Sequence, residues 1–98
     1  NVVLIDDMID TAGTITTAAG LIMDKGALSV RCLASHALLS GPAIERIENS
    51  PLVEVIVTDS VPIRKVSDKI KVISIADMFA DVITKVYYNE SISSSFIF

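Results

Sequence analysis

A continuous apolar run at residues 2–5 constrains the fold of this chain more than any other feature. The run is rich in β-branched side chains, and a strand of this kind is typically buried on both faces of a parallel sheet. It leads through a short polar turn into residues 14–25, which carry the stripe of an amphipathic helix. The stripe consists of Ile15, Ala18, Ala19 and Ile22. Gly26 is placed to end that helix, so this part of the chain predicts a strand–turn–helix unit.

The same alternation of strand and helix continues along the chain. Further apolar strands are predicted at residues 28–34, 53–57 and 71–75. Helices are predicted at residues 43–48, after Ser40-Gly41-Pro42, and at residues 76–88. The last helix has an apolar stripe that we expect to pack in a core, formed by Met78, Phe79, Val82, Ile83 and Val86. Together these elements predict an α/β fold with a parallel sheet, in which ligands bind beyond the carboxyl ends of the strands.

Bulk properties limit the possible functions. The 98 residues fit at most one domain, yet 51% of them are hydrophobic, more than so small a domain covers easily. No apolar run reaches the roughly 18–20 residues that span a bilayer, so we expect this surface to meet protein and not a membrane. The chain begins at Asn1 within a strand-like run, and we therefore expect it to be the C-terminal fragment of a longer protein.

Charge and cysteine content narrow the classes further. The net charge is −4 and Lys and Arg are not clustered, so the sequence lacks the footprint of a nucleic-acid-binding protein. Cys32 is the one cysteine, which excludes an internal disulfide and fits a reducing, cytoplasmic setting. We expect it to be a small buried hydrophobic residue.

The turn at residues 10–14 has the composition of a phosphate site. Its sequence is Asp10-Thr11-Ala12-Gly13-Thr14. Short side chains let a ligand approach the backbone N–H groups, and the following helix directs its unpaired N–H groups and positive dipole end to the same place. The threonines add hydroxyl donors. This arrangement suits a phosphate dianion without Lys or Arg.

The carboxylates beside the turn need a different partner, because an ionised carboxylate only accepts hydrogen bonds. Asp6 and Asp7 precede the turn and would match hydroxyls or metal-bound waters. A sugar phosphate such as ribose 5-phosphate satisfies both halves of the motif. Asp10 is expected to brace the turn by accepting backbone N–H groups. The alternative is an ordinary strand–turn–helix junction with acidic residues at the helix start.

At this point the sequence resembles a known family. The stretch VVLIDDMIDTAGT is similar to the phosphoribosyl-binding motif of ribose-phosphate pyrophosphokinases (PRPP synthetases) and type I phosphoribosyltransferases. Downstream, ASHALLSGPAIERI, VIVTDSVP, KIKVISIADMFADVI and NESISSSF resemble, in order, the closing third of PRPP synthetases. The resemblance covers essentially all of residues 1–98. It implies a type I phosphoribosyltransferase-like α/β fold, as the C-terminal part of the second domain of a PRPP synthetase, with the N-terminal domain absent.

The resemblance also implies an activity. The whole enzyme would transfer the diphosphoryl group of ATP to ribose 5-phosphate, with Mg²⁺, to give PRPP and AMP. It would be a homo-oligomer, with a hexamer expected. The implied ribose 5-phosphate site comprises Asp6, Asp7, Asp10, Thr11, Ala12, Gly13 and Thr14. An intersubunit regulatory phosphate or ADP site is implied at Ser91, Ser93 and Phe96, although Ser94 and Ser95 stand where bulkier residues often occur in the family.

The family's adenine-binding segment, flexible basic loop and Mg²⁺-linked His and Asp have no counterpart in these residues. We therefore expect no catalytic or metal-ligating residue here and no activity from the chain alone. Two alternatives remain: a type I phosphoribosyltransferase, and a catalytically inactive regulatory relative of the synthetases. An ATP-binding segment in upstream sequence would favour the synthetase over the first, and loss of an upstream catalytic Lys or Arg would favour the second.

The remaining polar residues have modest expected roles. His36 is expected just beyond the end of the second strand in a structural or supporting role, because no set of metal ligands accompanies it. Thr58 and Asp59 are expected to form a structural turn after the third strand. The helix at residues 43–48 is expected to present Glu45, Arg46 and Glu48 to solvent.

Overall fold

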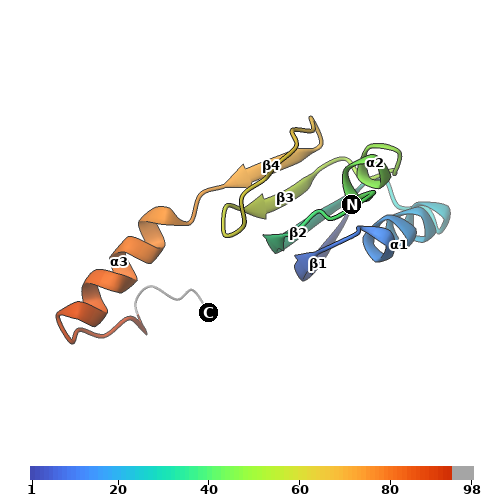
Figure 1. The fold of residues 1–98 in the computed structure, drawn as a ribbon. Helices are drawn as coiled ribbons and strands as arrows, with labels where there is room; N and C mark the ends of the chain where they lie inside the picture. The colour runs from blue at the N-terminus through green and yellow to red at the C-terminus, as the bar shows by residue number, and fades with distance from the viewer. Residues whose placement is uncertain (94–98) are drawn as a thin grey trace.

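The computed structural model describes residues 1–93 and contains one parallel sheet with three helices (Figure 1). The strands are β1 (Val2–Ile9), β2 (Val30–Ala37), β3 (Val55–Thr58) and β4 (Ile70–Ile73), hydrogen-bonded in the order β1-β2-β3-β4. The helices are α1 (Gly13–Asp24), α2 (Ala43–Glu48) and α3 (Ala76–Tyr87). The predicted α/β fold with a parallel sheet is confirmed.

One face of the sheet is covered by α1 and α2, which also contact each other. Strand residues at alternate positions point into this layer, among them Val30, Cys32, Val55 and Val57, each no more than 1% exposed. Ile15 and Ala19 of α1 and Ile47 of α2 close the core from the helix side. Helix α1 therefore buries Ile15 and Ala19 of its predicted stripe, while Ala18 and Ile22 are partly buried.

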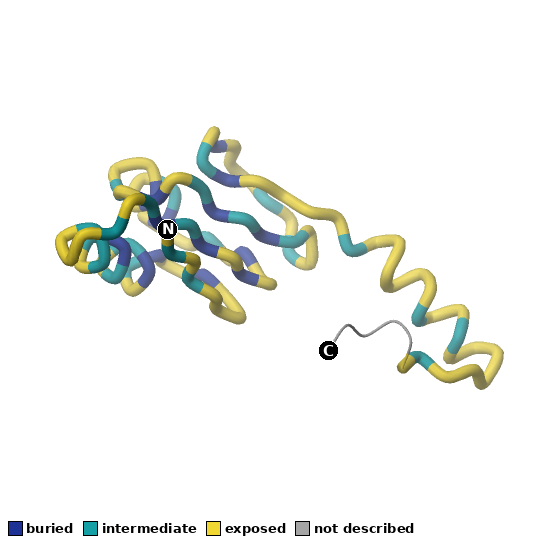
Figure 2. Tube along the Cα trace, turned by 180° about the vertical axis from the view of Figure 1, so that it is seen from behind, coloured by how far each residue is buried: buried dark blue, intermediate teal, exposed yellow. Residues whose placement is uncertain are grey.

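The opposite face of the sheet is uncovered, as the exposed segments of the sheet in Figure 2 show. Val3 is 51% exposed, Ile5 82% and Leu33 37%. The expectation that the first strand is buried on both faces is wrong for the part of the chain described here. The apolar composition of β1 is typical of a strand covered on both faces, but residues 1–93 provide a covering layer on one face only.

The last helix, α3, stands apart from the sheet (Figure 1). None of its residues is buried, and Phe79 and Ile83 are 50% and 66% exposed. The predicted core packing of its stripe is therefore wrong within residues 1–93. The helix itself forms where the 3.6-residue period predicts it, but periodicity does not say which surface will cover the stripe.

Two strands extend further than the sequence indicates. β1 continues from the apolar run through Asp6, Asp7 and Met8, and β2 continues to Ala37. His36 thus lies within β2, opposite Met8, and not beyond the end of the strand as predicted. Backbone pairing between the two strands extends both of them past the point where apolar side chains end.

Candidate functional site

The turn between β1 and α1 encloses a hollow of about 190 Å³. It is lined by Asp6, Met8, Ile9, Asp10, Thr11, Ala12, Gly13, Thr14 and Ile15. The structure therefore brings together six of the seven residues expected to bind ribose 5-phosphate. Asp7 is the one that does not line the hollow.

The N-terminus of α1 opens onto this turn without a side-chain cap. Its N-cap residue, Ala12, is 5% exposed and has φ 64°, in the left-handed region that L side chains rarely adopt. Within residues 1–93, the N–H groups of residues 11–14 donate no hydrogen bond. The hydroxyl of Thr16 donates to the Ala12 carbonyl at 2.6 Å, which secures the first turn of α1 while those N–H groups stay available.

Residues from other parts of the chain hold the turn in place through contacts that no local sequence pattern predicts. The Ser40 N–H donates to the Asp10 carbonyl at 2.8 Å, and Arg46 Nη1 of α2 donates to the Thr11 carbonyl at 3.1 Å. The Asp10 carboxylate accepts no hydrogen bond in the described chain, so it does not brace the turn as expected. Arg46 is exposed, yet it is more than part of a solvated helix face.

The acidic pair interrupts the regular ladder of β1. Asp6 pairs with Ala34 and Met8 with His36, while the position between them has no ladder partner. The Asp7 N–H donates to Asp6 Oδ1 and the Met8 N–H to Asp7 Oδ1, both at 2.8 Å. Both carboxylates are exposed. These local bonds from backbone N–H groups hold the two carboxylates near the carboxyl end of β1.

His36 has a partner that sequence reasoning missed. Its Nδ1 lies 2.7 Å from the hydroxyl oxygen of Ser60, which in turn donates to the Ser35 carbonyl at 3.1 Å. Thr58 Oγ1 donates to the same carbonyl at 2.6 Å. These bonds join the end of β2 to the loop after β3, and no local pattern predicts a pair 24 residues apart. These contacts fit the structural or supporting role expected of His36.

Asp59 fixes the connection from β4 to α3. The N–H of Ile75 donates to Asp59 Oδ1 at 3.0 Å. That bond, assisted by the Ser74 hydroxyl, lowers the pKa of the Asp59 carboxyl below its ordinary value. The turn expected at Thr58 and Asp59 begins one residue later than predicted, because Thr58 is the last residue of β3 and Asp59 follows it.

Cys32 is completely buried in β2, as predicted. Burial raises the pKa of its thiol, and the charge of Asp6 adds to the effect. A thiol of this kind is a poor nucleophile. The residue is part of the core and not of the site.

The expected regulatory residues are only partly described. The hydroxyls of Ser91 and Ser93 lie 2.9 Å apart, and the Ser93 N–H donates to Ser91 Oγ at 3.3 Å. Both side chains are exposed. Phe96 lies outside the described residues, so this site stays a prediction.

Metal and membrane features are limited to what residues 1–93 show. In this part of the chain no three His, Cys, Asp or Glu side chains gather into a metal site. Among the same residues, none of the helices has the length and apolarity required to span a bilayer.

Comparison with known proteins places this geometry in context. A family model described as the phosphoribosyl synthetase-associated domain matches residues 1–97. A ribose-phosphate pyrophosphokinase of Helicobacter hepaticus is 54% identical over 96 residues, which are 98% of this chain and 31% of the relative. A protein of the same name from Porphyromonas gingivalis is 48% identical over 98 residues, all of this chain and 31% of the relative. This chain thus spans less than a third of the length of these relatives.

A solved structure agrees with these sequence matches. The phosphoribosylpyrophosphate synthetase of Mycobacterium smegmatis superposes with a TM-score of 0.87 at 42% sequence identity. The match covers 89% of this chain and 30% of that one.

Proposed function

Because the chain belongs to the phosphoribosyl synthetase-associated domain family, we propose that it is the ribose 5-phosphate-binding part of a ribose-phosphate pyrophosphokinase. In the proposed reaction the C1 hydroxyl oxygen of ribose 5-phosphate bonds to the β-phosphorus of ATP. The bond from that phosphorus to the oxygen shared with the α-phosphate breaks, and AMP leaves. The hydroxyl proton is lost, and PRPP is formed.

One observation carries the binding role. The N–H groups of residues 11–14 have no partner within residues 1–93, and they border a hollow lined by the residues of this turn. Unpaired N–H groups at a helix N-terminus recognise phosphate through both hydrogen bonds and the helix dipole. We propose that Thr11, Ala12, Gly13 and Thr14 take the 5-phosphate in this way.

The carboxylates would select the sugar. Asp6 and Asp7 lie side by side at the end of β1, and each has one oxygen already engaged by a backbone N–H. The remaining acceptor capacity suits the ribose hydroxyls, with Asp10 between the sugar and the phosphate. Asp6, which lines the hollow, is the more direct contact.

Other requirements of the reaction would come from outside these residues. The described chain offers no set of metal ligands, and we propose that Mg²⁺ enters bound to ATP and neutralises its phosphate charge. The exposed apolar sheet face and the uncovered stripe of α3 support a homo-oligomer in which the rest of the protein covers them. We propose that the chain alone is inactive and that the complete enzyme is cytoplasmic.

Two alternative functions were open from the sequence. A type I phosphoribosyltransferase would share the turn. The relatives cited above, however, are named ribose-phosphate pyrophosphokinase, and their similarity extends over at least 98% of this chain. A regulatory relative without activity would have no need of a complete binding turn. The uncapped helix and the lined hollow at residues 6–15 therefore favour the enzyme.

Release of AMP tests the proposed function. The complete gene product, supplied with ATP, Mg²⁺, inorganic phosphate and ribose 5-phosphate, should release AMP and form PRPP in equal amounts. The 98-residue chain by itself should release none. A complete protein that releases no AMP, or that instead consumes PRPP with a nucleobase, would contradict the proposal.

Isosteric amide variants test the division of roles within the site. In the complete protein, Asp6→Asn should raise the KM for ribose 5-phosphate about tenfold, because an amide replaces a charged acceptor of hydroxyl protons. Asp7→Asn should raise it less, and neither change should alter the KM for ATP. Steady-state kinetics with each substrate varied in turn measure both constants.

Asp24→Asn is the matched control, since Asp24 is exposed at the far end of α1. It should leave both constants unchanged. Equal loss of ribose 5-phosphate and ATP binding in the Asp6 variant would show that the carboxylate supports the fold and does not contact the sugar.

A further inference from the structure

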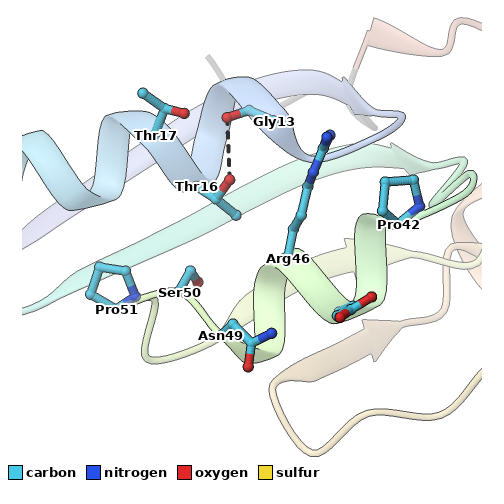
Figure 3. A pocket seen from close by; sticks show the side chains of 9 residues that line it. Gly13, Thr16, Thr17, Pro42, Arg46, Asn49, Ser50 and Pro51 are labelled. Atoms are coloured by element: carbon cyan, nitrogen blue, oxygen red, sulfur yellow. Dashed lines mark hydrogen bonds between the residues drawn. The ribbon is translucent and has the colours of Figure 1, made fainter.

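The side chain of Arg46 joins two helices at the phosphate turn. Arg46 lies on α2, 35 residues after Thr11, and its side chain extends toward the start of α1 (Figure 3). Nη1 donates to the Thr11 carbonyl oxygen at 3.1 Å. Among the hydrogen bonds of residues 1–93, no other charged side chain donates to the turn at residues 10–14. A guanidinium donor is permanently charged, which makes such a bond stronger than one between neutral groups.

The lack of a side chain at Gly13 leaves space for the guanidinium of Arg46. A Cβ at this position would lie 3.2 Å from Arg46 Nη1 and 3.9 Å from Cζ. Gly13 does not have a positive φ, so glycine is not needed there for the backbone conformation. Its small size instead leaves room for the guanidinium, which lies against the first turn of α1.

Holding the Thr11 carbonyl also sets the direction of a donor. The carbonyl of Thr11 and the N–H of Ala12 belong to one planar trans peptide and point in opposite directions. Arg46 does not line the hollow at residues 6–15; it lines a separate open hollow between α1 and α2. With the carbonyl fixed toward Arg46, the Ala12 N–H is directed away from the guanidinium.

The turn needs such an external tie. Ala12 has φ 64°, a conformation that is unfavourable for a non-glycine residue and persists only where surrounding contacts impose it. The three carboxylates of the motif also oppose an anion. A cation behind the turn offsets part of that repulsion without occupying the binding hollow.

We propose that Arg46 is a positioning residue for the ribose 5-phosphate site, and that Gly13 is a glycine so that this guanidinium fits. This inference rests on the proposed function. Arg46 does not touch the phosphate in this arrangement. It acts through the Thr11–Ala12 peptide, which it holds in the orientation that presents an N–H group to the ligand.

The test uses the complete protein and two readouts, the KM for each substrate and the calorimetric Kd for ribose 5-phosphate. Arg46→Met keeps the alkyl stem and removes the donors, so KM and Kd for ribose 5-phosphate should rise roughly tenfold. The KM for ATP and kcat should stay within about twofold. Arg46→Lys should recover most of the loss, because an ammonium group also donates to the carbonyl.

Glu45→Gln is the matched control, since Glu45 neighbours Arg46 on α2 and lines the same open hollow. It should behave as wild type. Gly13→Ala should weaken ribose 5-phosphate binding by less than Arg46→Met, because the flexible guanidinium needs to move only a few tenths of an ångström. The double variant Gly13→Ala/Arg46→Met should lose less affinity for ribose 5-phosphate than the sum of the two single losses.

The outcomes separate this inference from the proposed function. Unchanged ribose 5-phosphate binding in Arg46→Met, an equal loss for ATP, or additive effects in the double variant would each overturn the positioning role. A wild-type protein that binds ribose 5-phosphate but releases no AMP would overturn the proposed activity alone. A wild-type protein that binds no ribose 5-phosphate would overturn both.

Discussion

Helices α1 and α3 have the same length and opposite surroundings. Each has 12 residues and one apolar stripe. The stripe of α1 is buried against the sheet at Ile15 and Ala19, whereas α3 has no buried residue and lies away from the sheet (Figure 1). An amphipathic period therefore predicts that a helix will have a covered face, but it does not identify the cover.

The difference is consistent with the position of the two helices in the sheet topology. α1 connects β1 to β2, two paired parallel strands, and such a crossover lays its helix on the sheet. α3 follows the last strand, β4, and no further strand in residues 1–93 draws it back. Residues 1–93 therefore provide no cover for its apolar stripe.

A matched pair of isoleucines gives the largest expected contrast. Ile15→Ala in α1 should lower the free energy of unfolding by about 2–4 kcal/mol, because Ile15 is 7% exposed and its removal leaves a cavity. Ile83→Ala in α3, where Ile83 is 66% exposed, should change it by no more than about 0.5 kcal/mol in the 98-residue chain. Urea unfolding measures both. Similar losses in the two variants would mean that α3 packs on the sheet in solution.

Oligomerisation of the complete protein tests whether another subunit covers α3. If another subunit covers α3, Phe79→Ser should raise the dissociation constant of the assembly about tenfold or more, since a half-exposed aromatic side chain would lose its partner surface. Light scattering over a dilution series measures this. Asp77→Ser, on the polar side of the same helix, is the control. An assembly unaffected by Phe79→Ser would place the subunit interface elsewhere.

The junction that carries α3 should respond weakly to pH. The Asp59 carboxylate accepts the Ile75 N–H, and its pKa is below the ordinary value of 3.8. Its contribution to stability is therefore complete above pH values near 4 and is lost as the pH falls through the lower folded pKa. Asp59→Asn should slightly reduce the Tm at pH 7, and this difference from wild type should disappear under strongly acidic conditions.

Asp68→Asn, a change of the same kind at another exposed position, controls for the loss of one negative charge. A Tm difference for the Asp59 variant that grows as the pH falls would contradict the assignment of this bond.

Local features of the fold were predictable because they depend on neighbouring residues. The helix at residues 13–24 follows from its apolar period and from Gly26 after its end, and the helix at residues 43–48 follows from Pro42 at its start. The turn at residues 10–14 follows from its small side chains. These residues form a hollow because the strand and the helix on either side are themselves locally encoded.

Features that join distant parts of the chain were not predictable. The contact of Arg46 with Thr11 spans 35 residues and that of His36 with Ser60 spans 24. Neither has a local signal, because each depends on how the strands pair and how α2 crosses the sheet. The extension of β1 through Asp6 and Asp7 has the same origin, since pairing with β2 decides where the strand ends.

The buried thiol of Cys32 gives this sheet a chemical reporter. Alkylating reagents attack the thiolate, and the raised pKa and complete burial of this thiol keep it unreactive while β2 stays between its neighbours. Since the chain has one cysteine, every labelling event records an opening of the central strand. The ratio of the labelling rates measured with and without ribose 5-phosphate then gives the free energy by which this ligand would suppress the opening of β2.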